Sequence, residues 1–112
     1  MFGLFNRTKS YKDIDQQEML EGLKNDKNAV IIDVRSKGEF SSGHIPKALN
    51  IDIMSFEFGN KIKQLSPDKT YYVYCRSGNR SASACKSMGK AGLKNLFNLR
   101  GGLGSYSGKL VK

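Results

Sequence analysis

The pattern of apolar and polar residues divides the chain into short extended runs separated by helical segments. Residues 29–34 (AVIIDV) form a continuous apolar run rich in β-branched residues, which is typical of a strand covered on both faces. Residues 70–74 (TYYVY) and 95–99 (NLFNL) are further strand candidates, and residues 48–51 (ALNI) are a shorter one. Strands that alternate with helical patterns predict an α/β fold, with a mainly parallel sheet and helices on both faces.

The first helix carries a clear start signal. Asp15 and Glu18 have the spacing of a capping box, and Ile14 and Met19 are placed for a hydrophobic staple. We therefore expect this helix to begin near Gln16.

Three further helical segments are expected. Glycines and a proline limit any helix around Glu39 to a short one. Residues 58–65 place apolar side chains at helical spacing, and residues 81–91 predict an amphipathic helix with Cys85 on its apolar face. Residues 100–111 form a glycine-rich ending with room for a short helix.

Length and composition predict one domain. A chain of 112 residues, 38% of them hydrophobic, is long enough for one core and too short for two ordinary domains. We expect residues 1–10 to be a loose N-terminal arm and residues 11–112 to be the domain. No apolar run approaches the roughly 20 residues that span a bilayer, and the basic start lacks the features of a secretory signal. Two cysteines suit a reducing compartment, so a cytoplasmic location and no membrane association are expected.

The formal net charge of +9 is spread along the chain. The lysines form no basic block and no basic motif interleaved with aromatic residues, so nucleic acid is not an expected partner. A basic surface of this kind keeps a protein in solution and weakly attracts small anions.

The chemically informative segment is residues 75–81 (CRSGNRS). Cys75 ends a strand, and the loop after it leads directly into a helix, so backbone N–H groups and the helix N-terminus can face inward. Gly78 permits the backbone conformation that such a cradle needs. With Arg76 and Arg80 beside it, the Cys75 thiol is expected to have a lowered pKa and to act as a nucleophile inside an anion pocket.

Other strand ends bring charged residues to the same edge of the sheet. Asp33 and Arg35 close the strand of residues 29–34, and Arg100 follows that of residues 95–99. Ligands of open α/β sheets bind beyond the carboxyl ends of the strands, so these side chains are expected near Cys75.

Three segments resemble the signature regions of the rhodanese-like sulfurtransferase family, in the order found in its single-domain members. They are residues 31–51 (IIDVRSKGEFSSGHIPKALNI), 73–81 (VYCRSGNRS) and 99–106 (LRGGLGSY). The resemblance implies a five-stranded parallel sheet with flanking helices and a catalytic cysteine at Cys75. It also implies that thiosulfate gives its sulfane sulfur to Cys75 as a persulfide, which cyanide, a thiol or a protein acceptor then takes.

The resemblance assigns further residues to the site. Asp33 and Arg35 support it, and the substrate-binding loop contains Arg76, Ser77, Gly78, Asn79 and Arg80. We expect neither a metal nor a cofactor.

Two alternatives come from other functional classes. A phosphatase or arsenate reductase could use the same thiolate, but dual-specificity phosphatases of similar fold place five residues between cysteine and arginine, whereas four separate Cys75 from Arg80 here. The tighter loop favours a persulfide, and two arginines suit doubly charged thiosulfate better than mercaptopyruvate. A persulfide carrier or interaction module in a sulfur relay would need the same residues, and the sequence does not separate it from an enzyme.

Five other residues have expected supporting roles. Arg35 is spaced to pair with Glu39 four residues on. His44 is expected to tie loops together rather than to act as a base, and Cys85 to pack in the core. Tyr106 stands where the family more usually has a tryptophan, which affects the packing of the pocket rim but not the nucleophile.

Overall fold

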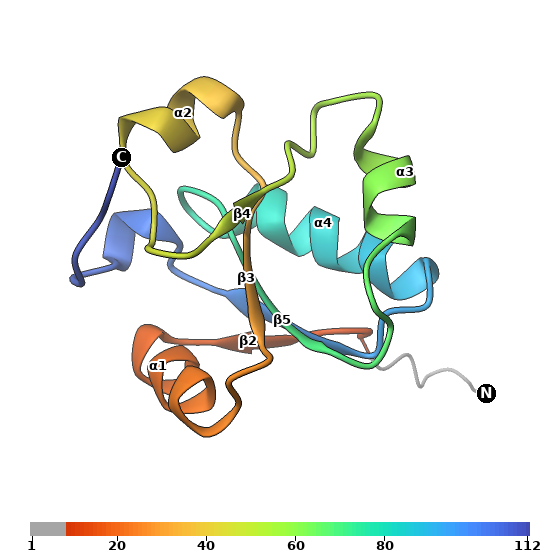
Figure 1. Ribbon diagram of the computed structural model, residues 1–112, viewed down its shortest axis with the longest axis horizontal. Coiled ribbons are helices and arrows are strands. Elements are labelled where there is room, and N and C mark those ends of the chain that lie inside the picture. Colours follow the sequence, from red (N-terminus) through yellow and green to blue (C-terminus); the bar gives the residue numbers. More distant parts are fainter. Residues whose placement is uncertain (1–8) are drawn as a thin grey trace.

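Five parallel strands form one sheet in the computed structural model, which describes residues 9–112 (Figure 1). The strands are β2 (Lys12–Ile14), β3 (Val30–Asp33), β4 (Leu49–Asn50), β5 (Thr70–Tyr74) and β6 (Asn95–Leu99). Their order across the sheet is β2-β6-β5-β3-β4, and each neighbouring pair is parallel. The predicted α/β fold with a five-stranded sheet is therefore confirmed.

Helices cover both faces of the sheet. Met19 of α1 (Gln16–Asn25) packs in a cluster with Ile31 on one face. Residues of α3 (Phe58–Lys63) and α4 (Asn79–Lys90) pack with Ile32 on the other face. Two short helices, α2 (Lys37–Ser42) and the 3₁₀ helix η1 (Leu103–Ser105), follow the ends of β3 and β6 (Figure 1).

Strand β5 lies at the centre of the sheet, and this position explains its continuously apolar sequence. Tyr71 and Val73 face the α3–α4 core, whereas Tyr72 and Tyr74 face the α1 core, and all four are buried. Because both faces are covered, no position on this strand is left for an exposed polar side chain. The strand delivers the residue that follows it, Cys75, to the carboxyl edge of the sheet.

Helix α1 begins where the sequence predicted. The backbone N–H of Glu18 donates to the Asp15 carboxylate at 2.9 Å, and the N–H of Asp15 donates to the Glu18 carboxylate at 3.0 Å. This reciprocal pair satisfies donors that have no partner within the helix. Ile14 and Met19, the residues of the expected staple, belong to the same core cluster.

The sequence patterns did not identify strand β2. Its three residues pair with β6, for example Lys12 with Phe97, but only Ile14 is buried. A three-residue edge strand with one buried side chain leaves no periodic signal. Of the arm expected at residues 1–10, residues 1–8 lie outside the described part of the chain, and Lys9 forms an ion pair with Asp13 at 2.9 Å.

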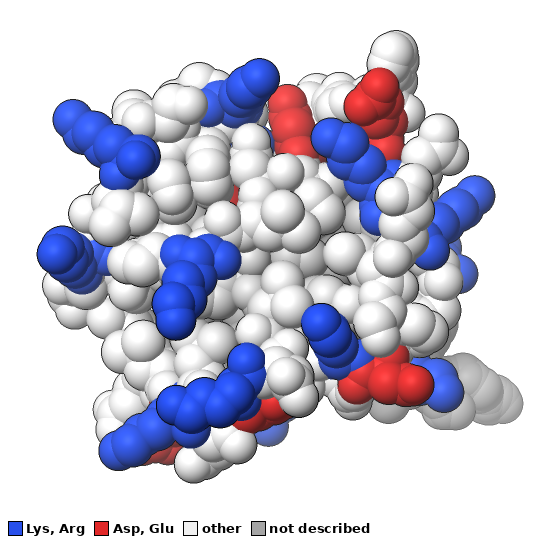
Figure 2. Space-filling view, viewed as in Figure 1, with Lys and Arg blue, Asp and Glu red and all other residues white. Residues whose placement is uncertain are grey.

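Within residues 9–112, no helix is long and apolar enough to cross a membrane. On the face drawn in Figure 2, lysine and arginine side chains lie all around the outline, several of them beside acidic side chains, and much of the surface between them is uncharged. This distribution agrees with the scattered lysines of the sequence.

Candidate active site

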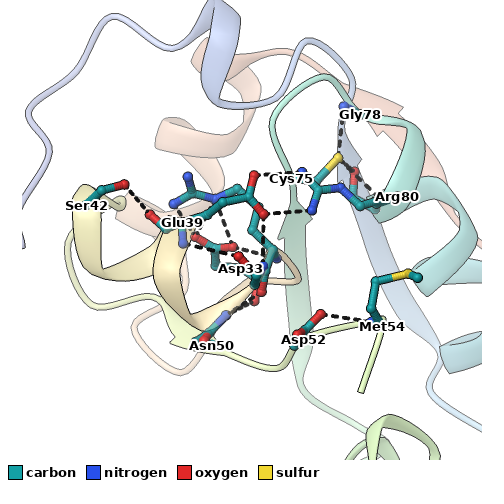
Figure 3. A network of polar contacts seen from close by, with 12 residues as sticks. Asp33, Glu39, Ser42, Asn50, Asp52, Met54, Cys75, Gly78 and Arg80 are labelled. Carbon is teal, nitrogen blue, oxygen red and sulfur yellow. Dashed lines mark hydrogen bonds and ion pairs between the residues drawn. The ribbon is translucent and has the colours of Figure 1, made fainter. Parts of the chain in front are cut away.

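The loop that joins β5 to α4 curves around the sulfur of Cys75. The sulfur accepts hydrogen bonds from the backbone N–H groups of Gly78 at 3.1 Å and Ser81 at 3.4 Å, and the Ser81 hydroxyl lies 3.4 Å away (Figure 3). Cys75 is only 1% exposed. The side chain is therefore almost completely enclosed by its neighbours.

Burial and hydrogen bonding act on the Cys75 thiol in opposite directions. Burial alone raises its pKa, but hydrogen bonds from the side chain and backbone of Ser81 and the backbone of Ser77 and Gly78 outweigh it, so that the pKa is lowered. The expected direction is thus found, but the leading cause is the hydrogen bonds rather than the two arginines. The attraction between Cys75 and Arg80 is a smaller contribution.

Two glycines allow the loop to interlock with the segment that follows β6. Gly78 has a φ of 97°, and a Cβ there would overlap the carbonyl oxygen of Arg100. Gly102 has a φ of 60°, and a Cβ there would overlap the carbonyl oxygen of Arg76. No residue other than glycine suits either position without strain.

Backbone hydrogen bonds hold this interlocked arrangement. Leu103 donates its N–H to the carbonyl oxygen of Cys75, and Gly104 donates to that of Arg76, both at 2.9 Å. The position of Cys75 therefore depends on residues that lie far from it in the sequence.

The guanidinium of Arg80 is paired with Glu39 of α2. Two hydrogen bonds, of 2.8 and 3.0 Å, join their side chains, which are about one-third exposed. Chiefly because of Arg80, the pKa of Glu39 falls to about 2. The expected pairing of Glu39 with Arg35 is therefore wrong. In the view of Figure 3 the Arg80 guanidinium lies between Glu39 and the Cys75 sulfur.

Arg35 instead forms a buried pair with Asp33. Its Nη2 lies 2.7 Å from Asp33 Oδ2 and donates a second bond of 2.7 Å to the carbonyl oxygen of Gly43. Arg35 is 3% exposed and Asp33 is fully buried. A buried charge pair with its hydrogen bonds satisfied fixes the geometry around it. The pair thus joins the end of β3 to the loop at Gly43.

The other predicted loop residues lie on the rim. Arg76, Ser77 and Asn79 are exposed, and Asn79 begins α4. These three residues therefore form the solvent-facing side of the loop.

The expected structural roles of two other residues agree with their surroundings. Cys85 is fully buried in the core, and burial raises its pKa to about 12. Nδ1 of His44 lies 2.8 Å from the carbonyl oxygen of Phe40, and the two rings stack at 3.6 Å. His44 also pairs through its backbone with Val111, so it joins three segments.

Sequence analysis missed two residues that contact Cys75 or its loop. In the described part of the chain, the buried polar or charged residues are Asp33, Arg35, Ser81 and Asn98. Ser81 touches the Cys75 sulfur, and Asn98 contacts Ser81 and the carbonyl oxygen of Gly78. The available signal was an asparagine inside the apolar run of residues 95–99, because an amide in a covered strand needs buried partners.

Two surface hollows lie outside the cysteine loop. One, of about 380 Å³, is lined by the start of α1 and residues 99–106, and the other, of about 460 Å³, lies beside α1, β3 and Pro46. Neither is lined by Cys75 or by the loop residues after it. Among residues 9–112 no group of three His, Cys, Asp or Glu side chains could hold a metal ion.

The model of the family described as Rhodanese-like domain matches residues 15–109. The chain belongs to the rhodanese-like family. This rhodanese-like chain is 34% identical over 98 residues to YtwF of Bacillus subtilis, named as a candidate sulfurtransferase, with 88% of this chain and 92% of YtwF covered. It is 29% identical over 100 residues to YrkF of the same organism, named as a candidate sulfur carrier, with 89% of this chain and 53% of YrkF covered.

A solved structure supports the same assignment. The rhodanese-related protein of Thermoplasma volcanium is 32% identical to this rhodanese-like chain and superimposes with a TM-score of 0.72, covering 90% of this chain and 98% of that one. The fold and the family thus agree with the resemblance drawn from the three signature segments.

Proposed function

We propose that the protein is a sulfurtransferase that carries sulfane sulfur as a persulfide on Cys75, with thiosulfate as donor and cyanide, a thiol or a protein thiol as acceptor. The observation that carries this proposal is the enclosed Cys75 sulfur, which receives hydrogen bonds from the backbone of Gly78 and Ser81. These donors stabilise a thiolate without a neighbouring base.

The reaction balances with the donor, the acceptor and the cysteine alone. The Cys75 thiolate attacks the outer sulfur of thiosulfate, a sulfur–sulfur bond forms to Sγ, and the bond to the sulfonate sulfur breaks. Sulfite leaves with the electron pair of that bond. The acceptor, cyanide or a thiolate, then attacks the outer sulfur of the persulfide, and Cys75 leaves as a thiolate again.

The enclosed position of Cys75 favours a sulfur donor over a phosphate ester. The outer sulfur of thiosulfate is a single projecting atom, whereas a phosphoryl group presents three oxygens that a loop must surround. Exposed Arg76 supplies positive charge for the sulfonate oxygens, and so does the part of the Arg80 guanidinium that Glu39 leaves free. These features support thiosulfate or another small anionic sulfane donor.

A persulfide carrier is the second candidate, and the likeness to YrkF favours it. In a carrier, another protein loads Cys75 and a third takes the sulfur, so thiosulfate reacts only incidentally. Steady-state kinetics separate the two functions, because a carrier turns over thiosulfate poorly but accepts sulfur quickly from a protein persulfide.

The deciding experiment is to mix the reduced protein with thiosulfate without an acceptor and to measure its mass. The mass should rise by one sulfur atom, and cyanide should restore the original mass and release thiocyanate. Reversal by cyanide distinguishes a persulfide from overoxidation of the same thiol.

Two variants act as controls. Cys75→Ser should take up no sulfur, and Cys85→Ala should behave like the wild type. Hydrolysis of a phenyl phosphate through Cys75 without sulfur uptake would replace the proposal with a phosphatase. Uptake only from a protein persulfide would favour the carrier.

A further inference from the structure

A chain of buried hydrogen bonds leads from the Cys75 sulfur to the edge of the sheet. The Ser81 hydroxyl lies 3.4 Å from Sγ and donates to the Asn98 side-chain oxygen at 2.5 Å. The Asn98 amide nitrogen donates to Asp13 at 3.0 Å and to the carbonyl oxygen of Gly78 at 3.3 Å. Ser81 is fully buried and Asn98 is 3% exposed, so water does not substitute for these contacts.

The two ends of this chain determine which atom donates at each step. One end of the Asn98 amide faces two oxygen atoms, those of Asp13 and Gly78, so this end must be the NH₂ group, which donates to both. The amide oxygen therefore faces Ser81. Hydrogen bonding from Asn98 lowers the pKa of Asp13, with help from Lys9, so the carboxylate that fixes this orientation stays ionised.

Ser81 has one hydroxyl proton and two neighbouring acceptors. With that proton directed at Asn98, the hydroxyl oxygen can only accept from Cys75, which suits the neutral S–H form. When Cys75 is a thiolate, its negative sulfur attracts the proton, because hydrogen bonds to charged acceptors are the stronger ones. The same hydroxyl cannot serve both acceptors fully.

We propose that Ser81 and Asn98 are positioning residues for Cys75. The single Ser81 O–H donates its hydrogen bond to the Asn98 oxygen when the sulfur is neutral and to the cysteine sulfur when the sulfur is negatively charged. Asn98 competes with the thiolate for this proton. In the persulfide the charge lies on the outer sulfur, so Sγ is neutral and the Ser81 hydroxyl again donates its hydrogen bond to Asn98. The relay thus favours the unloaded thiolate and promotes release of sulfur to an acceptor. This last step rests on the proposed sulfurtransferase function, whereas the sharing of the proton does not.

Charged groups around the relay come from several elements. They are Asp13 and Lys9 at β2, Arg80 on α4, Asp33 and Arg35 at the end of β3, and Arg100 after β6. The test therefore changes only the uncharged residues Ser81 and Asn98. Because Asn98→Leu also removes the hydrogen bond that lowers the pKa of Asp13, alkylation rates are compared well above the ordinary pKa of an aspartate, where Asp13 is ionised in every variant.

The test measures the rate of Cys75 alkylation by iodoacetamide as a function of pH, which gives the pKa of the thiol. Ser81→Ala removes the donor, so the pKa should rise and alkylation at mildly acidic pH should slow by about tenfold. Asn98→Leu removes the competitor, so the pKa should fall and alkylation should be faster than in the wild type. The pKa in the double variant should lie close to that in Ser81→Ala, and any remaining difference measures the hydrogen bond from Asn98 to the carbonyl oxygen of Gly78.

Ser83→Ala is the matched control, since Ser83 is an exposed serine on the same helix, and its rate should equal that of the wild type. Thermal unfolding of each variant verifies that it is folded. Shifts of the same sign in Ser81→Ala and Asn98→Leu, or no shift in Ser81→Ala, would overturn the relay. If Asn98→Leu does not fold, Asn98→Ala, which removes the same acceptor with a smaller side chain, takes its place.

The alkylation experiment involves no sulfur donor, so its result is independent of the proposed function. Opposite shifts in a protein that takes up no sulfur from thiosulfate would support the relay and overturn the thiosulfate reaction. Where both hold, the pH profile of sulfur uptake should move with the alkylation profile in each variant.

Discussion

Arg80 and Glu39 join the cysteine loop to α2 through two parallel hydrogen bonds, from Nη1 to Oε1 at 2.8 Å and from Nη2 to Oε2 at 3.0 Å. The carboxylate neutralises the guanidinium before any substrate arrives. A doubly charged anion entering the loop must therefore compete with Glu39 for Arg80, or bind to the part of the guanidinium that Glu39 leaves free.

Arg80→Ala should slow sulfur uptake from thiosulfate by about 10- to 100-fold, because hydrogen bonds to a charged group contribute about 1.5–3 kcal/mol. Sulfite release measures this rate. The substitution also leaves the Glu39 carboxylate unpaired, and Arg80→Ala/Glu39→Gln removes that repulsion, so it should recover part of the loss. Full recovery in the double variant would mean that Arg80 only neutralises Glu39.

Glu39→Gln should destabilise the protein in a pH-dependent way. Glutamine keeps the capping box with Ser36, so the variant isolates the ion pair. Arg80, with a smaller contribution from Ser36, depresses the folded-state pKa of Glu39 from 4.5 to about 2, so the stabilisation is complete above pH 4.5 and disappears as the pH falls toward 2. Partial exposure limits it to about 1 kcal/mol.

Urea unfolding of the wild type and Glu39→Gln at pH 7 and near pH 3 measures this difference. The gap between the two proteins should be largest at pH 7 and should narrow at the lower pH. A gap that stays constant would show that Glu39 contributes through its shape rather than its charge.

Cys75 should react with iodoacetamide much faster than Cys85 at mildly acidic pH. Hydrogen bonds lower the pKa of Cys75, whereas burial raises that of Cys85 to about 12, so only Cys75 provides an appreciable thiolate fraction. Peptide mapping after brief labelling identifies the site. Equal labelling of both cysteines in the folded protein would contradict the assignment of the nucleophile.

Gly78→Ala should be far more harmful than Gly92→Ala, although both glycines have a positive φ, of 97° and 102°. A Cβ at Gly92 meets open space, so that variant loses only about 1–2 kcal/mol from backbone strain. A Cβ at Gly78 overlaps the carbonyl oxygen of Arg100, which should bring the loss to about 3 kcal/mol or more and displace the loop.

Urea unfolding gives both stability changes, and the alkylation rate of Cys75 tests the loop. That rate should fall in Gly78→Ala and stay at the wild-type value in Gly92→Ala. Similar losses of stability in the two variants would mean that contact with Arg100 is unimportant.

The sequence predicted those parts of the fold that depend on neighbouring residues. Strands β3 and β5 are covered on both faces, so each is a continuous apolar run, and the start of α1 carries its own capping residues. Cys75 was proposed as the nucleophile because a strand end, a glycine turn and a helix start follow one another directly, and it stays a prediction. Strand β2 was missed because its extended conformation depends on pairing with β6, which lies near the other end of the chain.

The partners of the site residues were harder to predict. The four-residue spacing suggested Arg35 for Glu39, but the loop brings Arg80 to it from 41 positions away. Likewise, Ser81 and Asn98 are 17 positions apart and meet only when α4 packs on β6. Contacts of this kind follow from the packing of whole elements and have no local signature.

The contacts between the cysteine loop and the segment after β6 determine when the Cys75 thiol becomes reactive during synthesis. The ribosome makes Cys75 well before Asn98, Gly102 and Leu103, which hold its loop in place. Until those residues dock, the nascent chain carries a cysteine of ordinary reactivity. Thiol reactivity at mildly acidic pH is therefore a built-in reporter of folding, which should appear during refolding only when β6 has joined the sheet.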